Sequence, residues 1–153
     1  MKIKELLNEA LVLHNLKGTD KKEVLMELSD TIARQVSAVT KDDIFEALFA
    51  REQLGSTGME EGVAIPHAKV PDLPSIVIAF GRSIKGVDFQ SIDNKPTTLV
   101  FLLLAPEGSS GDHLKVLARL SRMLKDEEFR NQLLAAQGKE EIFKTILEYD
   151  RKF

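Results

Sequence analysis

The feature that most constrains the fold is the run Thr97–Ala105, in which Thr-Thr is followed by Leu-Val-Phe-Leu-Leu-Leu-Ala without a single charged residue. Turn-forming residues bound it on both sides, at 93–96 and 106–111. A continuous apolar run of this length is typical of a strand that is covered on both faces. Such a strand needs a layer of structure above it and another below it, so the run predicts a sheet packed between helices.

Further strands are predicted at 10–13, 63–69 and 75–84, where short apolar segments are separated by turn residues. Gly81 interrupts the last of these segments and is expected to mark a bulge. Strands and helices that mix along the chain without strict alternation predict an α/β fold with a mixed sheet and helices on both faces. The length of 153 residues is consistent with a single domain over 1–153.

Helices are predicted from apolar residues that recur near every fourth position. Thr19 is the expected N-cap of a helix whose apolar positions include Val24, Leu28 and Ile32, and Thr40 is the expected N-cap of the next helix, which approaches its end at Arg51. Ser110 is expected to cap a helix that places His113 at its third position. Helical patterns continue over 114–124, 127–136 and 139–149.

Composition excludes several classes of function. The formal net charge is −3 and no block of Lys and Arg stands out, so nucleic-acid binding is not expected. The absence of cysteine removes disulfides and thiolate nucleophiles, and any thiol chemistry would belong to a partner. The longest apolar run is too short to cross a bilayer, which predicts a cytoplasmic protein that is not membrane-embedded.

A glycine-rich stretch leads to the most informative histidine. Three glycines, Gly55, Gly58 and Gly62, follow a helix-compatible run. A short apolar segment comes next and is followed by Pro66 and His67. Glycine allows close approach of backbone amides, and proline restricts the backbone just ahead of His67. This layout favours presenting a side chain for chemistry, although a buried histidine satisfied by a carbonyl would fit the same pattern.

The three histidines differ in their surroundings. His14 follows a short strand with no glycine or capping residues nearby, so a structural or surface role is expected. His113 at a helix N-terminus is in a position that disfavours imidazolium and favours a nearby anion. Its alternative interpretation is a polar side chain that faces water.

Two kinds of chemistry fit His67 and His113. With Glu107 and Asp112 they form a conceivable set of metal ligands, but no spacing such as His-Glu-x-x-His supports a metal site. In the other interpretation one histidine carries a phosphoryl group, because a neutral imidazole nitrogen is a competent nucleophile. The donors that phosphoryl oxygens need are then Arg51, His113 and the glycine-rich loop.

Specific residues of this chain resemble the IIA proteins of the mannitol/fructose class of the phosphoenolpyruvate-dependent phosphotransferase system, over nearly the whole length. The matching segments are Arg51-Glu52, Leu54-Gly55-Ser56-Thr57-Gly58, Gly62-Val63-Ala64-Ile65-Pro66-His67, Pro106-Glu107, His113-Leu114 and Leu117. The segment Leu54-Gly55-Ser56-Thr57-Gly58 and the expected absence of a fused IIB or IIC domain are most similar to the nitrogen-type regulatory IIA proteins.

The resemblance implies a phosphotransferase component whose His67 accepts a phosphoryl group on Nε2 from HPr or a paralogous phosphocarrier. His67 would pass the group to a cysteine of a IIB partner, or its phosphorylation would be read as a signal by regulatory target proteins. Arg51 and His113 would line this site, and no metal or organic cofactor is implied.

Three more expectations concern the surroundings of His67. Ser56, Thr57 and Gly58 are expected to bind the phosphoryl group. Glu60 and Glu61 depart from the family pattern and are expected close to the site. Their carboxylates would repel a phosphoryl group there. An exposed apolar rim around His67 is expected, because specific docking needs a dry centre. The alternative function is a non-transferring module whose partner binding is switched by phosphorylation of His67.

Overall fold

Strand β5 (Thr97–Ala105) is the central element of the protein in the computed structural model, which describes residues 2–153. It pairs antiparallel with β4 (Val77–Val87) on one side and parallel with β2 (Val63–Ala64) and β3 (His67–Lys69) on the other. Strand β1 (Val12–Leu13) lies parallel to β4 at the far edge. All of β5 except Thr98 is buried, which confirms the predicted covered strand and its bounds.

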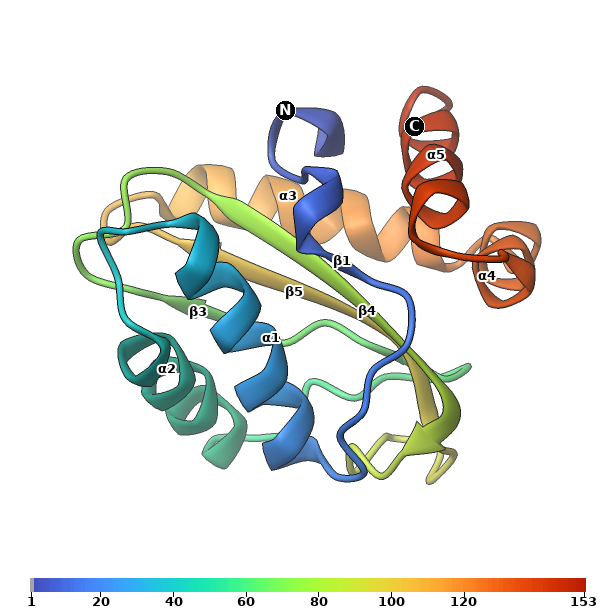
Figure 1. The fold of residues 1–153 in the computed structure, drawn as a ribbon, viewed down its shortest axis with the longest axis horizontal. Coiled ribbons are helices and arrows are strands. Elements are labelled where there is room, and N and C mark those ends of the chain that lie inside the picture. The colour runs from blue at the N-terminus through green and yellow to red at the C-terminus, as the bar shows by residue number, and fades with distance from the viewer. Residues whose placement is uncertain (1) are drawn as a thin grey trace.

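Helices cover both faces of this sheet, as predicted from the sequence (Figure 1). They are α1 (Lys21–Gln35), α2 (Lys41–Gln53), α3 (Ser110–Leu124), α4 (Glu127–Ala135) and α5 (Lys139–Asp150), with 3₁₀ turns η1 (Ile3–Glu5) and η2 (Glu9–Leu11) near the N-terminus. Helices α1 and α2 lie side by side on one face, and α3 crosses the other (Figure 1). No helix within residues 2–153 combines the length and hydrophobicity needed to cross a membrane.

The helix starts differ in part from the predictions. Thr40 caps α2 as predicted, since its side chain accepts a hydrogen bond from Asp43 N at 3.1 Å. The cap of α1 is Asp20 rather than Thr19, because the Asp20 carboxylate reaches Glu23 N at 2.8 Å. Helix α3 already includes Ser110, which was predicted as its N-cap, so His113 occupies the fourth position of the helix rather than the third.

The predicted strand over 63–69 is divided into β2 and β3, and Ile65 and Pro66 lie between them. Proline has no N–H to donate to a strand ladder, so a break here leaves no unpaired donor on that residue. The Pro66 carbonyl still accepts from Leu103 N at 2.9 Å, and Ile65 N donates to the Thr57 carbonyl at 3.2 Å. The chain therefore leaves the ladder for only two residues before His67 begins β3.

Gly81 does not mark a bulge, contrary to the prediction. It pairs in regular register with Val100, and the irregularity lies between Arg82 and Val87. The space at Gly81 is filled by Leu16, since a Cβ built there would lie 2.7 Å from a Leu16 methyl carbon. The glycine is therefore required by close packing across the sheet.

Gly81→Val is expected to lower the free energy of unfolding by about 1–3 kcal/mol, because the added side chain overlaps Leu16 in a fully packed region. Urea unfolding followed by circular dichroism measures this change. Gly111→Ala is the control, since a Cβ there meets no heavy atom within 4 Å. Equal loss of stability in both variants would contradict the packing explanation.

Candidate active site

His67 begins β3 directly after Pro66 and is half-buried. Its Nδ1 lies 2.7 Å from the carbonyl oxygen of Ile65. A carbonyl oxygen only accepts hydrogen bonds, so this contact assigns the proton of a neutral ring to Nδ1. Nε2 then carries a free lone pair and is the nucleophilic atom of the ring.

His113 lies beside His67, with the ring centroids 5.5 Å apart and the ring planes at 87°. It belongs to the first turns of α3, and its residue is only 7% exposed. Its Nε2 is buried and has no hydrogen-bond partner among the residues that the structure describes. An unpaired buried polar atom costs about 1–3 kcal/mol, and this one lies next to His67.

Both histidines are held in the neutral form. The pKa of His67 is lowered, mainly by burial and also by the positive charge of Arg51, against opposing effects of the Ile65 carbonyl and Glu52. The pKa of His113 is lowered by burial first, then by His67 and Lys69. A neutral His67 keeps its lone pair, and a neutral His113 still has one ring N–H to donate.

Arg51 lies in the last turn of α2 and is half-buried. Its Nη1 donates to the carbonyl oxygen of Gly55 at 2.9 Å, and it forms no ion pair with any residue in 2–153. A guanidinium carries five N–H donors, so most of its capacity stays available for an anion. Its effect on the pKa of His67 shows that its charge acts at the site.

The sequence prediction missed a buried ion pair beneath the glycine-rich loop. Lys21 Nζ lies 2.9 Å from Glu52 Oε1, and the two side chains are 12% and 3% exposed. The signal was present in the sequence, because Glu52 continues the spacing of four residues set by Ile44 and Leu48, the buried positions of α2. Glu52 was assigned no partner from the sequence, and the residue that pairs with it lies 31 positions away.

The donors predicted to bind a phosphoryl group are engaged by partners within the protein. Ser56 Oγ donates to the Phe89 carbonyl and accepts from Gly58 N at 3.0 Å. Thr57 donates to Glu52 through its hydroxyl and, at 3.1 Å, through its amide. In this structure the three residues fix the loop, and their contact with a phosphoryl oxygen stays a prediction.

Glu60 and Glu61 lie away from His67, contrary to the expectation that they are close to the site. Val63 pairs with Leu99 and His67 with Leu103, so the start of β2 is about 13 Å from His67 along β5, at about 3.3 Å per residue. The two glutamates precede β2 and line a hollow of about 490 Å³ that includes residues 121, 124 and 125, at the end of α3 opposite His113. Their carboxylates therefore do not surround the reactive nitrogen.

The remaining candidates lie outside this cluster. His14 is exposed next to β1, at the opposite edge of the sheet from β3. Within residues 2–153 no three His, Asp or Glu side chains are grouped so that they could hold a metal ion. Glu107 and Asp112 therefore do not complete a ligand set with the two histidines.

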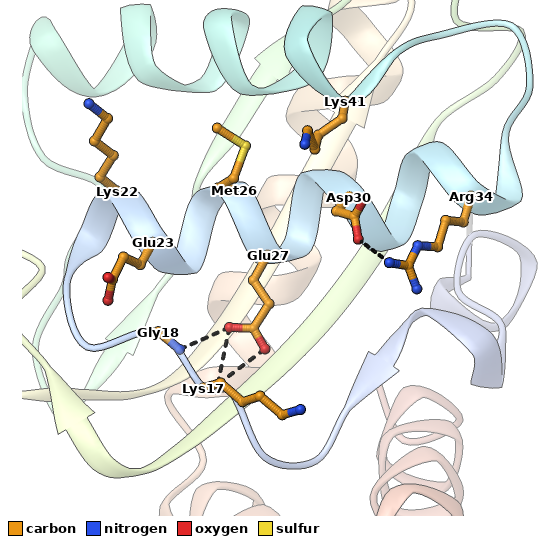
Figure 2. A pocket seen from close by; sticks show the side chains of 9 residues that line it. All are labelled: Lys17, Gly18, Lys22, Glu23, Met26, Glu27, Asp30, Arg34 and Lys41. Carbon is orange, nitrogen blue, oxygen red and sulfur yellow. Dashed lines mark hydrogen bonds and ion pairs between the residues drawn. The ribbon is translucent and has the colours of Figure 1, made fainter.

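A larger hollow of about 800 Å³ runs along α1 and does not include His67 (Figure 2). Two of its carboxylates are already engaged. The Glu27 carboxylate accepts from the amides of Lys17 and Gly18, and Asp30 pairs with Arg34 at 2.7 Å (Figure 2). No histidine of residues 2–153 lines this hollow, and the buried ring nitrogen without a partner belongs to His113, so the histidine pair is the better candidate for chemistry.

Comparison with known proteins shows the family of this chain. Residues 5–149 match the family described as "Phosphoenolpyruvate-dependent sugar phosphotransferase system, EIIA 2". A nitrogen regulatory protein of Bradyrhizobium diazoefficiens is 41% identical over 146 residues, which are 95% of each chain. The fructose-specific EIIABC component of Bacillus subtilis is 40% identical over 151 residues, 99% of this chain and 24% of that protein.

The fold is shared with solved members of the same family. The crystal structure of the nitrogen regulatory protein IIA-Ntr from Neisseria meningitidis superimposes with a TM-score of 0.88 at 35% identity, and the match covers 94% of this chain and 98% of that one. The match to the family model spans nearly the whole chain, and the relatives are similar over most of its length. The chain therefore belongs to the EIIA 2 family of the phosphoenolpyruvate-dependent sugar phosphotransferase system, as the sequence resemblance predicted.

Proposed function

We propose that this protein is a histidine phosphocarrier that accepts a phosphoryl group on Nε2 of His67. The observation that carries the proposal is the contact between His67 Nδ1 and the Ile65 carbonyl, because it leaves Nε2 as the unprotonated nitrogen. The unpartnered buried Nε2 of His113 next to it supplies a donor that a phosphoryl oxygen would satisfy. Membership of the EIIA 2 family supports the same chemistry.

The transfer conserves atoms and charge at each step. The Nε2 lone pair of His67 forms an N–P bond as the N–P bond of a donor phosphohistidine breaks, and the electron pair of that bond returns to the donor ring. In the second step a thiolate of an acceptor protein forms an S–P bond, and the electron pair of the His67 N–P bond returns to Nε2. This chain has no cysteine, so the thiolate must come from the partner.

Arg51 and His113 are assigned to stabilise the phosphoryl oxygens during transfer. Arg51 is the residue with free guanidinium donors and a charge that acts on His67. At an effective dielectric constant of about 20, a cation about 4 Å from a single negative charge gains about 4 kcal/mol before desolvation is counted. Neutral His113 adds a hydrogen bond without adding charge.

The donor we propose is HPr or an HPr-like phosphocarrier, and the acceptor is a cysteine of a IIB component. A second candidate is a regulatory function in which phosphorylation of His67 changes the choice of target protein. It is favoured by the match to the Bradyrhizobium nitrogen regulatory protein, which covers 95% of both chains. Both functions begin with the same modified atom, so the same first experiment serves both.

Incubation with phosphoenolpyruvate, enzyme I and HPr is expected to add one phosphoryl group that mild acid removes, as intact-protein mass spectrometry detects. His67→Ala should abolish the mass gain because it removes the nucleophile. His14→Ala is the matched control and should be phosphorylated like the unmodified protein. A phosphoryl group that persists in His67→Ala would refute the assignment of the accepting residue.

His113→Ala and Arg51→Met are expected to slow phosphorylation by about 10²-fold while leaving the group on His67, since each removes one stabilising donor at the transferred group. Quenched-flow measurement of the phosphorylation rate tests this effect. Arg34→Met is the control, because Arg34 pairs with Asp30 on the exposed surface of α1. Unchanged rates in both site variants would remove Arg51 and His113 from the mechanism.

The lowered pKa of His67 predicts that Nε2 stays unprotonated below the ordinary histidine midpoint of about 6.5. NMR titration of the ring protons should give a midpoint below that value, and Arg51→Met should raise it by removing a cation. Between that lowered pKa and about 6.5, the unfolded state binds a proton that the folded state does not, so the free energy of unfolding falls as the pH is lowered. A midpoint at or above 6.5 would contradict the neutral-nucleophile proposal.

Two exposed leucines adjoin the site residues in sequence and support the predicted apolar rim. Leu54, three residues after Arg51, is 85% exposed, and Leu114, directly after His113, is 66% exposed. We assign them to the surface that docks the phosphocarrier. Apolar side chains with this exposure contribute to binding when a partner covers them.

Leu54→Gln and Leu114→Gln are therefore expected to raise the apparent KM for phospho-HPr about 5-fold to 30-fold, since loss of an apolar contact at the centre of an interface costs about 1–2 kcal/mol. The rate at saturating carrier should change little. Ile84→Gln is the control, because Ile84 is 69% exposed on β4. If all three variants show the same KM as the unmodified protein, the leucines do not form the docking surface.

A further inference from the structure

We propose that the buried ion pair of Lys21 and Glu52 positions His67, through a continuous series of hydrogen bonds that fixes which ring nitrogen is free to react. The series runs from α1 through α2 and the glycine-rich loop to Ile65 and His67. Neither charged residue is assigned contact with the phosphoryl group. They are positioning residues for the proposed phosphocarrier chemistry, and the inference rests on that proposal only for the role of Nε2.

The series begins at an ammonium group whose donors all have acceptors. Lys21 Nζ donates to Glu52 Oε1 at 2.9 Å, to Gln90 Oε1 at 3.0 Å and to Ser56 Oγ at 3.3 Å. The same nitrogen lies 5.2 Å from the centre of the Phe89 ring. Three donors with three acceptors give Lys21 one defined position between α1, the loop and residues 89–90.

Glu52 connects Lys21 to the glycine-rich loop through hydrogen bonds. Its Oε1 accepts from Thr57 N at 3.1 Å in addition to Lys21, and its Oε2 accepts from the Thr57 hydroxyl. A carboxylate serves all three donors because both of its oxygens only accept. Glutamine would remove the negative charge that balances Lys21, and its NH₂ group would turn the Thr57 hydroxyl from a donor into an acceptor. The charged side chain therefore fixes the direction of these hydrogen bonds and pairs with the buried ammonium group.

Thr57 connects the loop to the residue that holds His67. The Thr57 carbonyl accepts from Ile65 N at 3.2 Å, and the Ile65 carbonyl accepts from His67 Nδ1 at 2.7 Å. Gly58 and Ala64 form an antiparallel bridge between these two segments, and Met59 N donates to the Val63 carbonyl at 2.7 Å. A shift of Thr57 would therefore move the carbonyl that selects the tautomer of His67.

Burial gives these contacts their strength. The Glu52 side chain is 3% exposed, so water does not replace a lost hydrogen bond there. Partners that orient a functional histidine from behind typically change activity about 10-fold to 100-fold when removed. The Glu52 charge also raises the pKa of His67, whereas the Arg51 charge lowers it.

The test compares Glu52→Gln with two other variants in the full chain. Lys21→Met removes the cation and keeps a side chain of similar length against Phe89. Asp150→Asn is the matched control, because Asp150 pairs with Arg119 at 2.7 Å and those side chains are 1% and 10% exposed, against 3% and 12% for Glu52 and Lys21. It disrupts an equally buried ion pair that the hydrogen-bond series does not include.

The main readout is the pair of ¹⁵N chemical shifts of the His67 ring, which report the tautomer directly. The unmodified protein and Asp150→Asn are expected to show a protonated Nδ1 and a free Nε2. Glu52→Gln should show a mixture of tautomers and a phosphorylation rate about 10-fold to 100-fold lower. Lys21→Met should change both in the same direction, and it decides the question if Glu52→Gln fails to fold.

An unchanged tautomer and an unchanged rate in the folded Glu52 and Lys21 variants would overturn the inference. An equal tautomer change in Asp150→Asn would also overturn it, since general loss of stability would then be the cause. The experiment distinguishes failure of the positioning role from failure of the phosphocarrier function. If the unmodified protein is not phosphorylated but Glu52→Gln shifts the tautomer, the positioning role holds and the phosphocarrier function does not.

Discussion

Pairing along strand β5 is the constraint on which the rest of the structure depends, because β2, β3 and β4 all pair with it. The edge that holds β2 and β3 keeps one register along β5, and the Pro66 carbonyl still accepts from Leu103 N at 2.9 Å. In this register Pro66 faces β5, so the backbone groups of Ile65 face the other side, where Ile65 N donates to the Thr57 carbonyl and the Ile65 carbonyl accepts from His67 Nδ1. The pairing with β5 therefore positions the carbonyl that His67 Nδ1 contacts.

The lowered pKa values favour the neutral form of the two histidine rings, and charged side chains lie around them. Burial keeps the pKa of both His67 and His113 low, while Arg51 and Glu52 act on His67 in opposite directions. A nucleophilic nitrogen needs its lone pair, and an incoming phosphoryl group needs positive charge nearby. Two neutral rings with one available guanidinium meet both needs without protonating the nucleophile.

The sequence was sufficient where a local pattern determines the structure. The apolar run of β5 predicted both the strand and its burial, and Thr40 predicted the start of α2. Predictions were off by one residue at two helix starts, where Asp20 rather than Thr19 caps α1 and Ser109 rather than Ser110 precedes α3. The second difference moves His113 from the third to the fourth position of α3, and it leaves His67 unchanged because β3 positions that residue.

The sequence was insufficient where function depends on long-range pairing. Glu52 and Lys21 are 31 positions apart, so neither indicates by itself that it is buried and paired. Glu60 and Glu61 were expected close to His67 because few residues separate them. An extended chain spans about 3.3 Å per residue, so these few residues place the two glutamates far from the histidine. Ser56 and Thr57 were predicted to offer donors to a phosphoryl group, whereas their partners within the protein, Phe89 and Glu52, became visible only in three dimensions.

The small number of free donors also bears on what the site is suited to do. The Ser56 and Thr57 hydroxyls and the Gly58 amide already donate within the protein. The donors that remain near the two histidines belong to Arg51, to His113 and to Lys69, whose ammonium group is bonded to Ser110 and whose charge acts on His113. A phosphoryl group surrounded by many fixed donors would be stabilised in its bound state as strongly as in transfer, and such uniform binding would slow its release. A site with few donors holds the group loosely and needs the partner to complete its surroundings. That requirement suits transfer of the group between proteins. It equally suits a regulatory function in which another protein recognises the phosphorylated histidine.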